Sequence, residues 1–104
     1  MSGPGPRWSF SAEMFRWDED GPSWRFIRVP RDVADEIREV SLQRRGFGSV
    51  RVTATVGETS WSTSVFPEQA TKSFLLPVKK AVRDKEGLDD GDVVTVELLL
   101  PDLD

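Results

Sequence analysis

The sequence of 104 residues contains no histidine, no cysteine and no tyrosine. These residue types supply the most common general bases, thiolate nucleophiles and phenolic acids of enzymes. A chain without cysteine also forms no disulfide bond and no thiolate metal site. The hydroxyls of Ser60, Ser62 and Ser64 have no histidine to activate them, so a solvated strand face is the better interpretation. We therefore expect a protein that is not an enzyme and carries no cofactor.

A metal site built from carboxylates alone is conceivable at two acid-rich segments, residues 18–21 and 89–92. Neither segment is followed by the spaced glutamate of a calcium loop. Aspartates beside glycine are ordinary turn residues. We therefore interpret both segments as turns and expect no metal.

Long apolar runs are also missing, since no segment approaches the roughly 20 apolar residues of a membrane span. No charged and then apolar leader stands at the start. These absences predict a cytoplasmic protein without a membrane partner.

The hydrophobic share is only 38%, but four Trp and six Phe supply large areas for one core. We expect one domain.

Basic residues are fewer than acidic ones, and the formal net charge is −4. A chain with this charge has no overall field that attracts nucleic acid.

The sequence divides into a disordered N-terminal arm at residues 1–7, a single β-barrel domain at residues 8–100 and an acidic tail at residues 101–104. The arm is assigned because residues 1–6 contain two prolines and two glycines.

Alternating apolar and polar residues predict most of the strands. The expected strands cover residues 8–17, 24–29, 50–56, 59–66, 74–76 and 92–100. The first and second strands form a hairpin that brings Trp17 and Trp24 together. Two short helices are expected, one after Pro30 and one with Val78, Ala81 and Val82 on its inner face. Gly87 and Leu88 should end the second helix in a Schellman-type contact.

One supersecondary unit, a strand, a proline, a helix, a glycine and a strand, occurs twice, at residues 24–56 and 72–98. Two copies predict a pseudo-twofold axis, with each helix covering one end of a shared barrel. One chain then closes the barrel without help, so a monomer is favoured. The expected fold is mostly β, a small closed barrel of about six to seven strands capped by two short α-helices.

The second copy resembles an AbrB-type half-barrel. The residues that carry this resemblance are 76–83, Gly87-Leu88 and 91–94. The longer stretch from Phe10 to Leu98, which includes residues 46–50 and 61–66, resembles the bacterial family known as domain of unknown function 1905. This resemblance implies a double-split β-barrel, related to the AbrB fold, with no established biochemical activity. It supplies no catalytic residues.

Two kinds of binding function stay open, for which the sequence offers different candidate residues. A small ligand or a protein would contact an aromatic patch of Trp17, Trp24 and Trp61, although core packing explains tryptophans equally well. The alternative is a nucleic-acid-binding regulator or antitoxin-like protein that contacts duplex DNA, as AbrB relatives do. Its candidate residues are Arg28, Arg31, Arg44, Arg45 and Arg51. Acidic residues crowd the helix between these arginines, which favours a solvated helical face.

Overall fold

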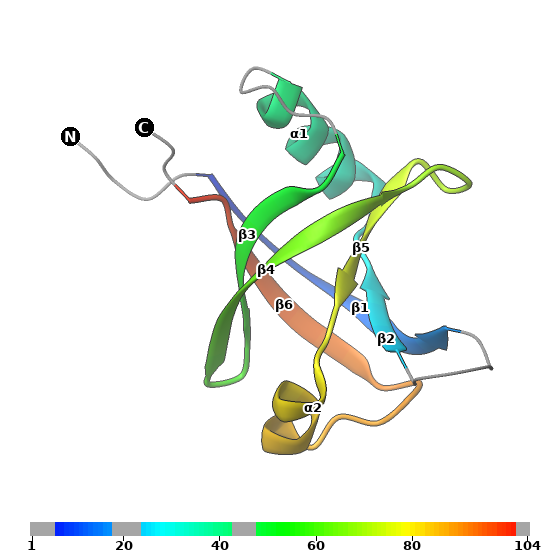
Figure 1. Cartoon of the computed structure of the whole chain (residues 1–104), viewed down its shortest axis with the longest axis vertical. Coiled ribbons are helices and arrows are strands. Elements are labelled where there is room, and N and C mark those ends of the chain that lie inside the picture. The colour runs from blue at the N-terminus through cyan, green and yellow to red at the C-terminus, as the bar shows by residue number, and fades with distance from the viewer. Residues whose placement is uncertain (1–5, 18–23, 43–47, 102–104) are drawn as a thin grey trace.

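Six segments in which apolar and polar side chains alternate form the strands of a closed antiparallel barrel, and a helix covers each end of it (Figure 1). The computed structural model describes residues 6–17, 24–42 and 48–101. Its elements are β1 (Arg7–Trp17), β2 (Trp24–Arg28), α1 (Arg31–Leu42), β3 (Val50–Val56), β4 (Thr59–Glu68), β5 (Ser73–Pro77), α2 (Lys80–Glu86) and β6 (Val93–Leu99). The carbonyl oxygen of Pro6 accepts a hydrogen bond from the amide of Leu100 at 2.8 Å, so strand pairing already begins within the expected arm.

The barrel closes in the strand order β1-β2-β5-β4-β3-β6. Two long strands each divide between two partners. β1 pairs first with β6 and, from Met14 onward, with β2, while β4 pairs with β3 up to Val65 and then with β5. This division of β1 and β4 is the double-split arrangement. The predicted closed barrel with two capping helices is confirmed, with six strands in the described residues.

The internal repeat is also confirmed, and it is longer than the sequence match indicates. Its two copies are β1-β2-α1-β3 and β4-β5-α2-β6. The amide of Val29 donates to the carbonyl oxygen of Phe74 at 2.9 Å, and the equivalent bond runs from Val78 to Arg25 at 3.0 Å. Val29 and Val78 therefore occupy equivalent positions.

The two prolines of the repeat do not correspond in the structure. Pro30 directly precedes α1, whereas Pro77 is the last residue of β5 and pairs with Phe26. The extended residue Lys79 takes the equivalent place before α2. The sequence match between the prolines is therefore shifted by two residues from the structural equivalence.

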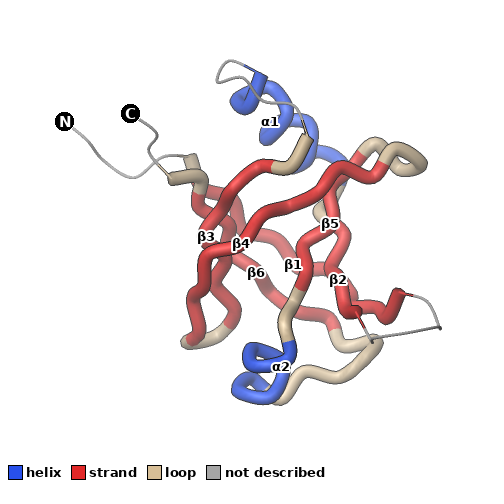
Figure 2. The backbone as a smooth tube through the Cα atoms, viewed as in Figure 1, coloured by secondary structure: helices blue, strands red, loops and turns tan. Residues whose placement is uncertain are grey.

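The core lies inside the barrel, between helices at opposite ends (Figure 2). Fully buried side chains include those of Met14, Ile27, Leu76 and Leu98, which come from four different strands. Both repeats therefore contribute to one continuous core, as expected when successive side chains of a strand point to opposite faces of the sheet.

The residues that helix α2 buries in the core differ from those predicted. Ala81 is exposed, so its placement on the inner face was wrong. The reason is that α2 begins only at Lys80, so Val78 reaches the core from the preceding connection and Val82 is the helical residue that is buried. The predicted end of α2 is confirmed, because Gly87 is left-handed at φ 65° and the Leu88 amide donates to the Arg83 carbonyl oxygen at 2.9 Å.

Candidate functional site

A hollow of about 320 Å³ lies at the end of the barrel that α2 covers. We call it the α2-end hollow. The tryptophans and cations that line it are Trp24, Arg25, Trp61, Lys79, Lys80 and Arg83. They come from β2, from β4, and from α2 with the residue that precedes it, so three separate parts of the chain meet there. The hollow is at the lower limit of the 300–1,000 Å³ that is typical of ligand sites.

The three tryptophans of the predicted patch have different positions. Trp61 is half-buried and packs against the core, while its ring borders the α2-end hollow. Trp24 is 55% exposed and stacks on Phe26 with a centroid separation of 6.4 Å. Trp17 pairs with Trp24 across the hairpin, which confirms that the two lie together. Trp17 borders a second, shallower hollow of about 300 Å³ that it shares with Trp24 and Phe26. Trp24 therefore links both hollows.

Arg25 is the most constrained cation of the α2-end hollow. Its Nε donates to the carboxylate of Asp90, and only 16% of its side chain is exposed. Its Nη1 is buried and has no hydrogen-bond partner among the described residues. A buried donor without an acceptor costs about 1–3 kcal/mol.

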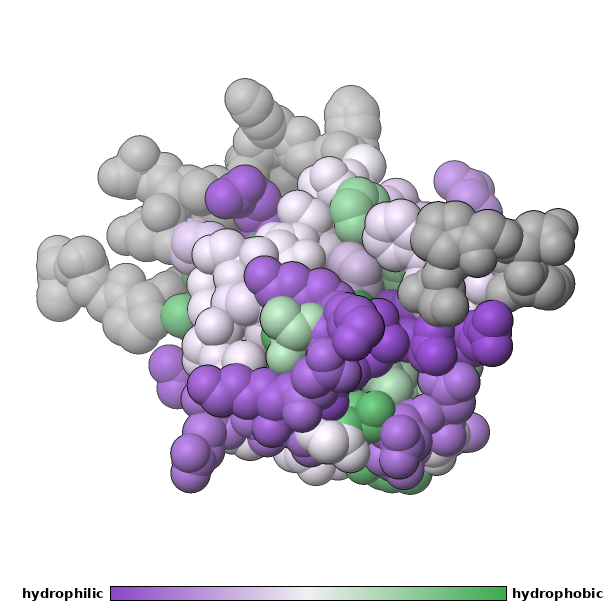
Figure 3. Space-filling model, turned by 60° about the horizontal axis from the view of Figure 1, so that its bottom comes forward, coloured by the Kyte–Doolittle hydropathy of each residue, from purple (hydrophilic) through white to green (hydrophobic). Residues whose placement is uncertain are grey.

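The other three cations that line the hollow are Lys79, Lys80 and Arg83. Lys80 forms an ion pair with Asp84 at 2.9 Å, and the Nε of Arg83 donates to the carbonyl oxygen of Val78 at 3.1 Å. Lys79 is exposed and has no ion pair within the described parts of the chain. Figure 3 brings this end of the molecule forward and shows hydrophilic side chains around small apolar areas.

The charge of the α2-end hollow is opposite to that of the whole chain. Four cations and no carboxylate line it within the described residues, whereas the formal net charge of the chain is −4. Aromatic rings and cations side by side suit a ligand that is both flat and negatively charged. The arrangement therefore favours binding of an aromatic anion.

The arginines predicted for nucleic acid lie on different elements. Arg44 and Arg45 fall outside the described residues, and the other three lie on three different elements. Arg28 lies on β2, Arg31 begins α1 and pairs with an aspartate at 3.7 Å, and Arg51 is exposed on β3. Strands β2 and β3 are separated by two strands in either direction around the barrel. Binding of nucleic acid through these arginines stays a prediction.

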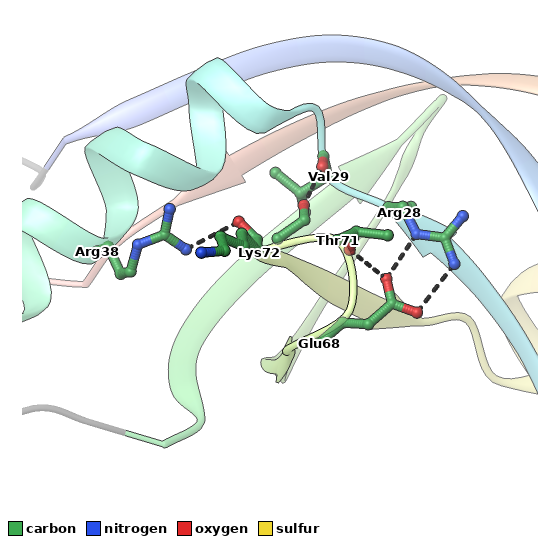
Figure 4. A network of polar contacts seen from close by, with 7 residues as sticks. Arg28, Val29, Arg38, Glu68, Thr71 and Lys72 are labelled. Atoms are coloured by element: carbon green, nitrogen blue, oxygen red, sulfur yellow. Dashed lines mark hydrogen bonds and ion pairs between the residues drawn. The ribbon is translucent and has the colours of Figure 1, made fainter.

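Arg28 is held within a polar network at the α1 end of the barrel (Figure 4). Its Nε and Nη2 donate to the two carboxylate oxygens of Glu68 at 2.6 and 3.0 Å. Thr71 donates to the same carboxylate at 2.6 Å, and Arg38 donates to the carbonyl oxygen of Lys72 at 3.0 Å. This network fixes the loop between β4 and β5 against β2 and α1.

The network makes stability depend on pH. The hydrogen bond from Arg28 lowers the pKa of Glu68 below its ordinary value, assisted by Thr71 and opposed by partial burial. A depressed pKa in the folded state means that the stabilisation is present above the ordinary pKa and is lost as pH falls through the folded one. We expect Glu68→Gln to reduce the free energy of unfolding by about 1 kcal/mol at pH 7. The difference should vanish in acid, as measured by urea unfolding between pH 7 and pH 2.

The matched control is Glu97→Gln, which removes the carboxylate of an exposed ion pair with Arg7 at 3.3 Å. Its effect at pH 7 should stay within about 0.5 kcal/mol. Equal effects of the two variants at every pH would show that the Glu68 network contributes nothing specific.

Reasoning from the sequence considered Arg25 only as a partner that stacks on the neighbouring rings, and it did not place Arg25 or the lysines in a hollow. It placed Lys79, Lys80 and Arg83 on an ordinary exposed side of the second helix. The cluster of bases near α2 was a visible signal. Its proximity to Trp24 and Arg25 depends on the pairing of β2 with β5, which the sequence alone does not specify.

Comparisons with known proteins agree with the family resemblance. A family model described as a domain of unknown function (DUF1905) matches residues 10–98, which is most of the chain. A search of curated proteins found no match. Among the residues that the structure describes, no helix combines the length and the apolar character of a membrane-spanning segment.

Proposed function

This chain belongs to the family described as domain of unknown function 1905, and we propose that it is a non-catalytic binding module for a small aromatic anion. The site is the α2-end hollow. The observation that carries the proposal is the lining of the hollow, where four cations and two tryptophans meet and no carboxylate is found among the described lining residues. An anionic oxygen forms the strongest hydrogen bonds with guanidinium and ammonium groups such as those that line the hollow.

The remaining groups define the rest of the ligand. The rings of Trp24 and Trp61 border the hollow and offer surfaces on which a flat ring would stack. Lys79 and Arg83 add positive charge without a competing carboxylate in the described lining. A volume of about 320 Å³ limits the ligand to a small molecule. An aryl phosphate or aryl carboxylate has this combination of size, shape and charge.

Calorimetric titration with phenyl phosphate tests the proposal, with inorganic phosphate and phenol as separate titrants. We expect saturable binding of phenyl phosphate and at least about tenfold weaker binding of either part alone, because ring and anion contribute together. Lys79→Gln should weaken the binding of phenyl phosphate by about fivefold. The control Lys72→Gln removes an exposed lysine outside the hollow and should leave binding unchanged.

The titration also contains the result that would overturn the proposal. Absence of saturable binding by phenyl phosphate would reject an aromatic anion as the ligand class. Equal loss of binding in the Lys79 and Lys72 variants would show a general charge effect in place of a defined site.

A further inference from the structure

The outer surface of the barrel carries a second feature, a continuous row of large apolar side chains. We call it the aromatic wall, and it consists of Phe15, Trp17, Trp24, Phe26, Phe66 and Leu75. Three directly opposed pairs build it across β1, β2, β5 and β4. These are Phe15 with Phe26, Trp17 with Trp24, and Phe66 with Leu75. The intervening residues of the same strands, such as Met14 and Ile27, point into the core. The wall therefore adds nothing to the packing of the barrel interior.

Much of the aromatic wall is accessible. Four large hydrophobic residues are exposed among those that the structure describes, and three of them, Trp17, Trp24 and Phe66, belong to the wall at 44%, 55% and 45% exposure. The rings support one another, since Trp17 lies edge-on to Phe26 at a centroid distance of 5.7 Å. A contiguous apolar surface of this kind marks an interaction site on a soluble protein.

The size of the wall limits what could cover it. The exposed parts of its three most accessible side chains amount to about 300 Å², given about 150–250 Å² for a whole aromatic side chain. A stable subunit interface needs about 800 Å² on each partner. A second copy would also bring together two chains of formal net charge −4. The area and the charge both favour a short segment of a different protein.

Charge beside the wall indicates the chemistry of that segment. The wall ends at Trp24, which also borders the α2-end hollow with its four cations. Arg16 and Arg25 lie directly opposite each other on β1 and β2, and Asp90 pairs with Arg25. Arg16 has no ion pair within the described residues. An apolar surface thus continues into a positive one.

We propose that the aromatic wall and the α2-end hollow together dock a peptide segment of a partner protein that carries aromatic or aliphatic side chains followed by acidic ones. The apolar side chains cover Trp17, Trp24 and Phe26, and a carboxylate enters the hollow near Lys79. This inference rests on the proposed function, because it uses the same hollow for the anionic group. It extends that function from a small aromatic anion to a protein partner.

Selection from a random dodecapeptide library displayed on phage, with the full chain immobilised, tests this inference. We expect enrichment of peptides that combine aromatic or aliphatic residues with Asp or Glu. The enriched peptides, synthesised and labelled, should bind at least about tenfold more weakly to Trp17→Ser and about fivefold more weakly to Lys79→Gln. The control Val93→Ser changes a residue that is 72% exposed on β6, outside the wall, and should not weaken binding.

Several outcomes would overturn the inference. These are no enrichment over a blank surface, a basic consensus, or equal binding by Trp17→Ser and the original chain. A dimer in sedimentation analysis that Trp17→Ser abolishes would make a second copy the occupant and would also reject it.

Binding of phenyl phosphate to the unsubstituted chain separates this inference from the proposed function. If phenyl phosphate still binds but no peptide is enriched, only the peptide inference fails. If neither binds, both proposals fail.

Discussion

Replacing Leu98 with Ala is expected to lower the free energy of unfolding by about 3 kcal/mol. Leu98 is fully buried on β6, opposite Trp8 on β1 and Ala54 on β3. Its side chain therefore fills the core at the point where β6 joins two neighbouring strands. Truncation loses the apolar burial and leaves a cavity that a closed barrel has little freedom to collapse. Urea unfolding followed by tryptophan fluorescence measures the difference.

Val93→Ala is the control for Leu98→Ala, because Val93 lies on the same strand but is 72% exposed. It should change the free energy of unfolding by less than about 0.5 kcal/mol. The midpoint of unfolding should also be independent of protein concentration, since one chain closes the barrel. Equal effects of the two variants, or a midpoint that rises with concentration, would contradict a core enclosed by a single chain.

Replacing Gly57 with Ala is expected to cost about 2–3 kcal/mol, from two sources. Gly57 is left-handed at φ 59°, a conformation that is unfavourable for alanine. An added Cβ would also fall on the carboxylate of Glu86, 2.8 Å from its Cδ. That carboxylate accepts hydrogen bonds from the Thr59 hydroxyl at 2.6 Å and the Glu58 amide at 3.3 Å. The Glu86 side chain therefore has to move, which breaks its hydrogen bonds to the β3–β4 turn.

Gly87→Ala is the matched control for Gly57→Ala. Gly87 has a similar φ of 65°, but an added Cβ there meets nothing within 4 Å. It should cost about 1 kcal/mol, from backbone strain alone. In a Glu86→Ala background, Gly57→Ala should cost no more than Gly87→Ala. An unchanged difference in that background would show that the Glu86 carboxylate is not responsible.

Local patterns were sufficient to predict most of the fold. The alternation of Val50, Val52, Ala54 and Val56 placed β3 correctly, because period-2 burial is a direct consequence of strand geometry. Gly87 marked the end of α2, because it takes up the left-handed conformation at the C-cap. The sequence was least reliable where a helix begins, as at Pro77, since a proline is equally acceptable as the last residue of a strand.

The candidate site was less accessible to prediction, because it depends on distant pairings. Trp24 and Trp61 were identified as candidate binding residues, and the structure places both beside one hollow. The position of Arg25 in the lining of the hollow was not predicted, since an arginine between two aromatic residues of a strand has no distinctive local pattern. Only the pairing of β2 with β5 brings it close to Lys79. Such a cluster has no signature in any single stretch of sequence.

The chain provides its own reporters for the central claim that an aromatic anion binds in the α2-end hollow. Four tryptophans give four indole N–H signals in a ¹H–¹⁵N correlation spectrum. During titration with phenyl phosphate, the signals of Trp24 and Trp61 should shift together with one dissociation constant. The signal of Trp8, whose Nε1 donates to Glu36 at 2.8 Å outside the hollow, should stay in place. Unchanged signals of Trp24 and Trp61, or equal shifts of all four, would contradict the proposed site.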